Sequence, residues 1–228
     1  MRLADRKLED MKLEDIRRQY TLDKLDLDDL NKNPFIQFKS WLQIATDANL
    51  NGDPTAMTLA TVNSEGKPSQ RVVLLKHLDE DGFVFYTNLG SRKAQEIRSN
   101  TNVSLHFAWL PLERQVSISG TASKLSIAEA SRYFISRPHD SQLAAWASHQ
   151  SKIIESRKML DLAFEQIKNR FQKGQVPLPS FWGGYRVQPS AFEFWQGRKN
   201  RLHDRFLYKP KKAGDDKLSN WEIQRLQP

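Results

Sequence analysis

The sequence predicts an α+β protein organised around an antiparallel sheet or barrel, and three observations support this fold class. Short β-rich runs follow one another through tight turns over residues 55–124. Helical patterns are gathered in one later block, at residues 126–173, instead of alternating with the strands. No G-x-G-x-x-G or G-x-x-x-x-G-K-[ST] segment is present, which argues against a doubly wound dinucleotide fold or a P-loop.

The composition indicates a soluble globular protein. The 228 residues are 39% hydrophobic and 27% charged, which suits one large domain with a tail. A net charge of +8 allows nucleic acid, anionic surfaces or phosphorylated small molecules as partners. The absence of cysteine excludes disulfides, thiolate nucleophiles and Cys-ligated metals, and the five histidines do not cluster at metal-ligand spacing, so we expect no metal. With no signal peptide or membrane-spanning run, we expect a cytoplasmic protein.

The chain divides into an arm and one domain. Residues 1–30 carry nine acidic and seven basic side chains, so we expect a mobile arm with helical character around Leu8 to Tyr20. Residues 31–228 form the domain, and its first helix begins with Asn33 as N-cap and Pro34 at the first helical position. The apolar face of that helix consists of Phe35, Phe38, Leu42 and Ala45.

The elements that follow can be bounded from their turns and caps. Before residue 125 we expect strands at 55–62, 72–75, 83–87, 102–109 and 115–124, with a helix at 92–99. Residues 63–67 are expected to make a hairpin turn from strand 55–62 into the next stretch. The strands at 72–75 and 83–87 are expected to be joined by the turn at 79–82 and to pair. A capping box at Ser126 and Glu129 starts a helix that ends before Pro138. Beyond it we expect helices at 140–147 and 152–173 and strands at 181–187, 191–195, 203–208 and 221–226.

One stretch has the composition of a phosphate site. Ser91 is a plausible N-cap, and Arg92 and Lys93 fall in the first helical turn, where cations are unfavourable unless an anion is bound there. Arg71 and Lys76 close the two ends of the preceding strand. Each cation alone is better explained as a solvated hairpin end, but four together favour an anionic ligand.

Two further groups of residues are candidates. Tyr133 and Arg137 share a helix face, and with Ser141 at the next helix start they could hold an oxyanion, although an ordinary capped break between helices explains them too. If residues 201–205 are extended, Arg201, His203 and Arg205 point to one face. The alternative is an exposed edge strand protected by its charges.

Several separated motifs together resemble the pyridoxamine 5′-phosphate oxidase family. They are RVVLLK at 71–76, FYTNLGSRK at 85–93, LERQV at 112–116, SRPHDSQ at 136–142, SHQS at 148–151, VPLPSFWGGYRV at 176–187, WQGRKNRLHDRF at 195–206 and the closing RLQP. The resemblance covers about residues 15–228. It implies a split β-barrel with flanking helices and a homodimer with FMN bound at the subunit interface.

The resemblance also implies roles for residues at matching positions. It implies FMN contacts at Arg71, Val72, Val73, Leu74, Leu75, Lys76, Tyr86, Thr87, Arg92, Lys93, Gln115, Gln150, Ser151, Trp195 and Arg205. It implies substrate contacts at Arg17, Arg18, Gln19, Tyr20, Lys76, Tyr133, Arg137, Ser141, Arg201, Leu202 and His203, with Arg201 and His203 at the reacting carbon.

The implied reaction oxidises pyridoxamine or pyridoxine 5′-phosphate to pyridoxal 5′-phosphate, as oxygen becomes hydrogen peroxide. The flavin supplies the redox chemistry and the protein supplies position and electrostatics. Two other classes fit part of the sequence. A nucleic-acid-binding β-barrel would use the positive charge and the six tryptophans, and a non-catalytic flavin- or haem-binding split barrel would lack turnover.

Overall fold

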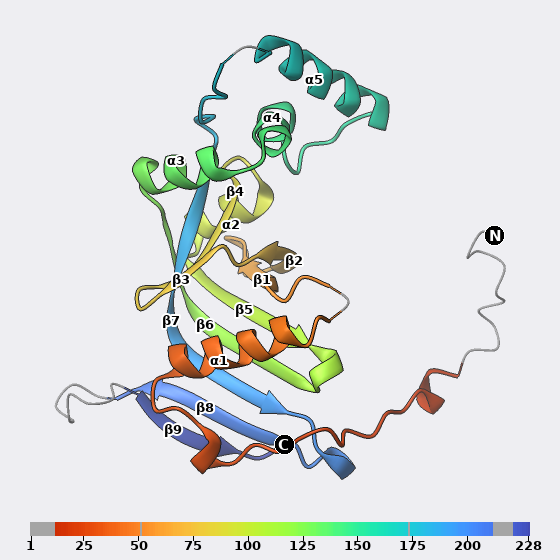
Figure 1. Cartoon of the computed structure of the whole chain (residues 1–228), viewed down its shortest axis with the longest axis vertical. Coiled ribbons are helices and arrows are strands. Elements are labelled where there is room, and N and C mark those ends of the chain that lie inside the picture. Colours follow the sequence, from red (N-terminus) through yellow and green to blue (C-terminus); the bar gives the residue numbers. More distant parts are fainter. Residues whose placement is uncertain (1–11, 51, 173, 212–220) are drawn as a thin grey trace.

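The computed structural model describes residues 12–50, 52–172, 174–211 and 221–228 (Figure 1). Within them one antiparallel sheet has the strand order β2-β1-β5-β6-β7-β4-β3, with β8 paired to β7 and β9 to β8. The strands are β1 (Ala56–Val62), β2 (Pro68–Leu74), β3 (His77–Asp79), β4 (Gly82–Asn88), β5 (Asn102–Trp109), β6 (Arg114–Lys124), β7 (Trp182–Gln196), β8 (Asp204–Pro210) and β9 (Trp221–Leu226).

The sheet curls without closing. Its two outer strands, β2 and β3, are not hydrogen-bonded to each other in the described residues, so the barrel is split. The long strand β7 holds the two ends of the molecule together. One edge of β7 pairs with β6 over most of its length, and the other edge pairs first with β4 and then with β8. The predicted antiparallel fold with flanking helices is confirmed.

Helices lie over the sheet and beyond its upper end in Figure 1. They are α1 (Pro34–Asp47), α2 (Arg92–Ser99), α3 (Ile127–Ser136), α4 (His139–Ala147) and α5 (Arg157–Arg170), with 3-10 turns η3 (Leu13–Asp15), η4 (Leu27–Asp29), η5 (Leu110–Leu112) and η6 (Lys199–Arg201). The Asn33 side chain accepts from the Phe35 N–H and so caps α1 as predicted. None of the helices described is long and apolar enough to cross a membrane.

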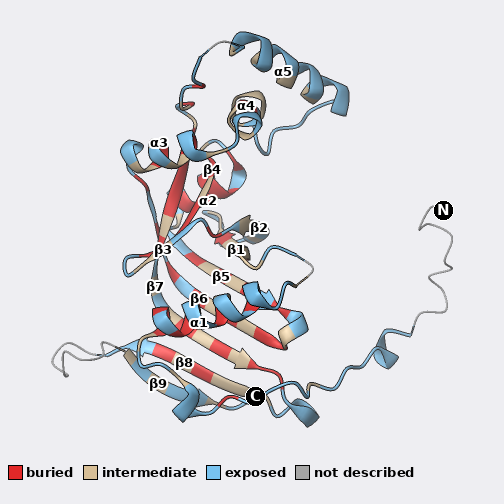
Figure 2. Ribbon diagram, viewed as in Figure 1, coloured by how far each residue is buried: buried red, intermediate tan, exposed pale blue. Residues whose placement is uncertain are grey.

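The core lies between α1 and the concave side of the sheet. Phe35, Phe38 and Ala45 of α1 are buried, and Phe38 meets Phe83 and Phe107 edge-on at 4.9 and 4.8 Å between ring centroids. Figure 2 shows the buried residues concentrated in the strands and the inner face of α1, whereas α5 is largely exposed. Aromatic packing of this density gives the sheet a rigid frame for the loops at its ends.

Four element predictions were wrong in detail. Strand 72–75 does not pair with 83–87: β2 pairs with β1, and β4 takes the short β3 as its hairpin partner. The strands expected at 181–187 and 191–195 are one strand, β7, with a register shift opposite Ser119 and Gly120. Helix α5 starts later than expected, because Ser156 caps it through the Met159 N–H. Of the helix expected at 8–20, only the turn η3 is present in residues 12–20, and residues 8–11 lie outside the described residues.

Candidate functional site

A cavity of about 370 Å³ opens where β2, β4, α2, α3 and α4 meet. Ten of the predicted site residues line it together: Val72, Val73, Leu74, Lys76, Tyr86, Thr87, Lys93, Tyr133, Arg137 and Gln150. Residues from five elements far apart in the sequence therefore converge on one pocket. We call this cavity the cationic pocket, because Lys76, Lys93 and Arg137 contribute positive charge to it.

Lys93 is a buried cation in this pocket. Its Nζ donates to Thr87 Oγ1 at 3.2 Å and to Gln150 Oε1 at 3.3 Å. Both partners are neutral, and no carboxylate of the described residues lies within ion-pair distance of this Nζ. Burial, and then the charge of Arg71, lower the pKa of Lys93 to about 8. A buried ammonium without a counter-ion is costly, so the pocket favours an anionic ligand.

The start of α2 adds backbone donors beside Lys93. Ser91 takes the N-cap position, as predicted, but its hydroxyl makes no cap hydrogen bond and lies 3.5 Å from the Thr87 hydroxyl. The first N–H groups of a helix have no partner within the helix, and the helix dipole places partial positive charge there. A helix N-terminus with a nearby lysine is a common arrangement for binding phosphate.

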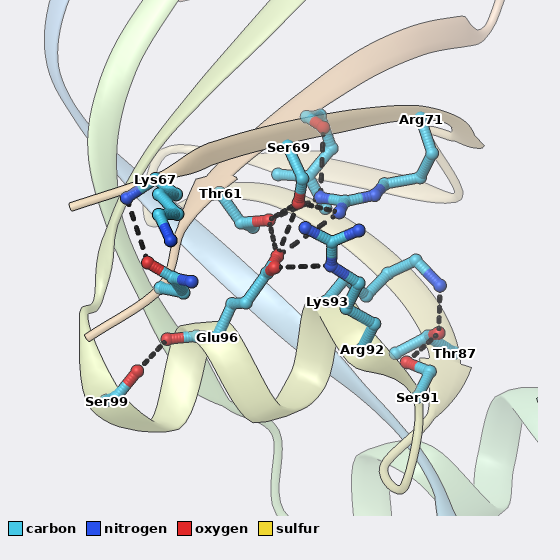
Figure 3. Close-up of polar contacts among 12 residues, drawn as sticks. Thr61, Lys67, Ser69, Arg71, Thr87, Ser91, Arg92, Lys93, Glu96 and Ser99 are labelled. Carbon is cyan, nitrogen blue, oxygen red and sulfur yellow. Dashed lines mark hydrogen bonds and ion pairs between the residues drawn. The ribbon is translucent and has the colours of Figure 1, made fainter. Parts of the chain in front are cut away.

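Arg71 and Arg92 are held beside the pocket by Glu96, a residue that the sequence analysis did not single out (Figure 3). One Glu96 oxygen accepts from Arg92 Nε at 2.8 Å, and the other lies 3.3 Å from Arg71. Burial alone would raise the pKa of Glu96, but hydrogen bonds from Ser69, Thr61 and the two arginines lower it to about 2. The i, i+4 spacing of Arg92 and Glu96 is the signal that could have found this group.

An aromatic stack forms another wall of the cationic pocket. The Tyr86 ring stacks on Tyr133 at 4.0 Å between centroids and on Trp182 at 5.3 Å. The Arg137 guanidinium lies 4.9 Å from the Trp182 ring, and its buried NH1 has no hydrogen-bond partner. A buried donor without a partner is a second sign that this pocket accepts an anion.

The glycine pair before Tyr185 makes room for this stack. A Cβ at Gly184 would lie 2.7 Å from the Phe85 carbonyl oxygen and 2.8 Å from the Tyr86 ring. Glycine is therefore required by the close approach of β4 to β7. Trp182, which stands just before the pair and lines the pocket, was missed as a site residue although the aromatic W-G-G sequence marks it.

Seven of the remaining predicted residues form a second group at the other end of the sheet. Arg17, Arg18, Gln19, Tyr20 and Arg201 line a cavity of about 650 Å³ near the start of β8, and none of them lines the cationic pocket. His203 adjoins it, with its ring 4.5 Å from the Trp195 ring and 5.5 Å from the Tyr20 ring. We call Tyr20, Trp195 and His203 the ring cluster.

The predicted extended geometry of residues 201–205 was wrong. Residues Lys199–Arg201 form the turn η6, and Asn200 and Arg201 have φ angles of 58° and 61°. Strand β8 begins only at Asp204, so alternation along a strand does not place Arg201, His203 and Arg205 on one face. Arg205 instead pairs with Glu193 at 2.8 Å and donates to the Gln227 carbonyl.

A backbone hydrogen bond from Arg198, just before the turn η6, determines which ring nitrogen of His203 carries the proton. The Arg198 backbone N–H donates to His203 Nδ1 at 3.1 Å. Because an N–H can only donate, Nδ1 is an acceptor, and the neutral ring carries its proton on Nε2. Burial, and then the charge of Arg201, lower the pKa of His203. His203 is therefore a neutral hydrogen-bond donor through Nε2 near pH 7.

The other predicted residues lie in various places around these two groups. Leu75 is buried in the core, and Gln115 faces Trp195 across the β6–β7 pairing. Ser151 lines a separate cavity near α5, and Ser141 lies in the first turn of α4 without lining the cationic pocket. Leu202 is exposed beside the ring cluster.

Comparison with known proteins identifies close relatives. Residues 43–171 match the family described as "Pyridoxamine 5'-phosphate oxidase", and residues 182–228 match the "Pyridoxine 5'-phosphate oxidase C-terminal dimerisation region". Proteins named pyridoxine/pyridoxamine 5′-phosphate oxidase from Hahella chejuensis and Crocosphaera subtropica are 68% and 58% identical to this chain. Each alignment covers 93% of this chain and 97% of the relative.

Solved structures agree with the fold. PhzG from Burkholderia lata, solved with tetrahydrophenazine-1-carboxylic acid, aligns with a TM-score of 0.81 at 31% identity, over 91% of this chain and 99% of that one. A pyridoxamine 5′-phosphate oxidase-related, FMN-binding protein from Nostoc punctiforme aligns with a TM-score of 0.68 at 15% identity, over 87% of this chain and all of that one. The second likeness concerns the fold alone.

Proposed function

This chain belongs to the pyridoxamine 5′-phosphate oxidase family, and from that premise we propose that its cationic pocket holds FMN and a phosphorylated B6 substrate. The protein is an oxidase of pyridoxine and pyridoxamine 5′-phosphate. The observation that carries the proposal is that the pocket contains two separate cationic groups, the buried Lys93 and the half-buried Arg137 with its buried NH1, and no carboxylate of the described residues is paired to either.

The first cationic group fits the phosphate of FMN. Lys93, the start of α2 and the hydroxyl of Thr87 lie together, and they offer donors of the kind that phosphate oxygens accept. Arg71 and Arg92 stand behind them, oriented by Glu96, and add positive charge. FMN ends in a single phosphate, so scattered cations can hold it without a glycine-rich loop.

The second cationic group fits the phosphate of the substrate. Arg137 has an unpartnered buried N–H, and Tyr133 and Lys76 line the same pocket. The guanidinium is held against the Trp182 ring and is therefore ordered before the ligand arrives. An ordered arginine loses less entropy on binding, which favours recognition of a phosphate.

The ring cluster is proposed to contact the substrate's reacting end from the partner subunit. The protein is a homodimer, as its match to the family's dimerisation region supports. The cationic pocket and the ring cluster belong to separate cavities of one chain. Strand β2 beside the pocket is an outer strand with exposed apolar side chains, Val72 being 67% exposed. If FMN lies at the interface, each active site can take its cationic pocket from one chain and its ring cluster from the other.

The chemistry divides between the cofactor and the protein. Bound FMN would accept hydride from the substrate and pass its electrons to oxygen. Arg201 would stabilise negative charge on the substrate, since a guanidinium stays protonated. His203 would donate a hydrogen bond from Nε2 to the reacting amine or alcohol, because its Nδ1 is already occupied by the Arg198 N–H. The arm residues around Tyr20 would exclude water.

The visible spectrum tests the proposal directly. The purified protein should be yellow and should lose its flavin absorption when pyridoxamine 5′-phosphate is added without oxygen. Admitting oxygen should restore the colour and release one equivalent of hydrogen peroxide. Pyridoxamine without its phosphate is the matched control and should bleach the flavin far more slowly. A colourless protein that cannot be reconstituted with FMN would contradict the cofactor assignment, and a yellow protein that stays oxidised would contradict the substrate.

The dimer gives a prediction of its own. Light scattering of the FMN-loaded protein should give twice the chain mass of 26.5 kDa. Activity per chain should fall on dilution at the concentration where the mass falls, because the separated chains each lack half of the residues around the substrate. A monomer that keeps both FMN and full activity would show that one chain completes the site.

A further inference from the structure

Glu113 and Arg114 are two neighbouring charged residues in the LERQV segment that the proposed site does not use. Both side chains are buried, with exposed fractions of 2% for Glu113 and 11% for Arg114. Glu113 also has a left-handed backbone, with φ at 55°. Two adjacent buried charges require partners of opposite charge, and for both residues that partner comes from the N-terminal arm.

Glu113 accepts two hydrogen bonds from the arm. Arg18 NH2 donates at 3.0 Å to one carboxylate oxygen, and the Leu22 backbone N–H donates at 3.0 Å to the other. These two contacts fix one arm side chain and one arm backbone position together. A carboxylate that accepts a backbone N–H holds the chain itself and not only a flexible side chain.

Arg114 holds the next part of the arm. Its NH2 donates to Asp23 Oδ2 at 2.7 Å, while Nε donates to Gln196 Oε1 and the guanidinium lies 4.5 Å from the Trp41 ring. Asp23 is the carboxylate paired with this guanidinium in the described residues. If the arm left, Glu113 and Arg114 would lose their ion-pair partners, Arg18 and Asp23, at the same time.

Gly197 completes the surface under the arm. Its N–H donates to the Glu113 carbonyl at 2.7 Å, and a Cβ on Gly197 would lie 2.8 to 2.9 Å from the Tyr20 ring. The Tyr20 ring therefore packs directly on the Gly197 backbone, and it meets the Trp195 ring edge-on at 5.7 Å between centroids. In Figure 1 the arm runs beside β8 toward the chain's C-terminus.

We propose that Glu113 and Arg114 are positioning residues that hold residues 18–23 in place, so that Tyr20 completes the ring cluster against which the substrate binds. This rests on the proposed function for the identity of the substrate. The contacts that Glu113 and Arg114 make with the arm involve no substrate, so the cost of ordering residues 18–23 does not fall on substrate binding. Loss of an anchor should therefore raise KM and leave kcat nearly unchanged.

The test uses the FMN-loaded full chain and the variants Glu113→Gln and Asp23→Asn. Asp28→Asn is the matched control, because it removes the same charge from the arm at a position without a contact to Glu113 or Arg114. Limited trypsin digestion, followed by mass spectrometry, measures cleavage after Arg17 and Arg18. Steady-state kinetics gives KM and kcat, and flavin absorbance with thermal unfolding monitors the fold.

Both anchor variants should be cleaved about tenfold faster at the arm and should show KM raised about tenfold, in keeping with the loss of a charged hydrogen bond. Flavin content and kcat should stay within about twofold of wild type. The arm contributes equally to binding of the substrate and of the transition state, and losing such binding changes KM but not kcat. Cleavage rates and KM equal to those of Asp28→Asn would overturn the proposal. Faster cleavage with unchanged KM would also overturn it, since the arm would then be anchored without positioning substrate.

Two features keep the result interpretable. Asp23 is 51% exposed, so Asp23→Asn tests the anchor even if Glu113→Gln fails to fold. The trypsin measurement does not depend on the substrate. If the wild type were inactive on B6 phosphates, the proposed function would fail. Faster cleavage of the anchor variants than of Asp28→Asn would still show that Glu113 and Asp23 hold the arm.

Discussion

Replacing Arg201 by methionine should lower kcat/KM by roughly a hundredfold or more, the range for losing one positioned electrostatic group. FMN should remain bound, because Arg201 lines the cavity by the ring cluster and not the cationic pocket. Arg201 has no carboxylate partner among the described residues, and its charge is thus available to a ligand. Its left-handed φ of 61° is a further sign of a constrained position.

Anaerobic stopped-flow reduction of the flavin separates substrate binding from the chemical step. Arg201→Met should slow reduction, raise the substrate concentration for half-maximal rate, or do both. Lys199→Met is the matched control, since it removes a positive charge from the same turn η6 without lining the cavity. A variant at Arg201 that reduces its flavin at the wild-type rate with wild-type affinity would remove this residue from the chemistry.

His203→Asn should cost less than Arg201→Met. In the proposed site the neutral His203 would donate one N–H to the substrate, and hydride transfer would not require it as a base. Asparagine can offer a similar donor, so we expect a loss nearer to the roughly 1 kcal/mol of an ordinary hydrogen bond. Because burial and Arg201 lower the pKa of His203, this donor stays in one form from neutral pH upward.

The second large effect is expected at Lys93. Lys93→Met should weaken FMN binding by about tenfold to a hundredfold, since a hydrogen bond to a charged group contributes about 1.5–3 kcal/mol. Methionine fills most of the buried volume, and the change therefore removes the charge with little loss of packing. Flavin fluorescence titration of the apoprotein measures the affinity. Arg98→Met, on the same helix but outside the pocket, controls for net charge.

The pH dependence gives the Lys93 prediction a sharper form. Lys93 in the free protein has a pKa of about 8, and a bound phosphate favours its charged form and raises that pKa. FMN affinity should therefore be constant from about pH 7, where the phosphate is a dianion, up to about 8. It should then fall as pH rises through 8, by at most about tenfold per unit. In Lys93→Met this fall should vanish, and an unchanged pH profile would show that another group is responsible.

Arg92→Ala should also weaken FMN, but less than Lys93→Met. Arg92 is 63% exposed and already paired with Glu96, so part of its charge is compensated before any ligand binds. In the sequence, the four cations of residues 71–93 are equivalent members of one set. The structure distinguishes the lysine that faces the pocket from the arginines that are held behind it.

Local signals in the sequence predicted local structure well. The bounds of α2 and β5 agree with those expected, and Asn33, Ser126 and Glu129 cap their helices through side-chain hydrogen bonds. These features depend on hydrogen bonds between residues within one helical turn of each other, so a short segment of the sequence determines them. The capping residues could therefore be predicted without knowledge of the fold.

Features that depend on residues far apart in the sequence were harder to predict. The local hairpin expected at residues 63–67 does join β1 to β2, but the pairing expected between β2 and β4 did not form, because it depends on the packing of the whole sheet. Residues 201–205 do not form one extended strand, because Asn200 and Arg201 have left-handed backbones and β8 starts only at Asp204. Glu113 and Arg114 resemble solvated charges in the sequence, and only the docked arm shows that they are buried.

The separation of the cationic pocket from the ring cluster has a genetic consequence. If each site of the dimer takes its pocket from one copy and its rings from the other, a copy defective at Lys93 and a copy defective at Arg201 are complementary. A mixed dimer of the two would contain one site with both defects and one site with none. Two inactive alleles could thus restore partial activity in the same cell, although neither chain is competent by itself.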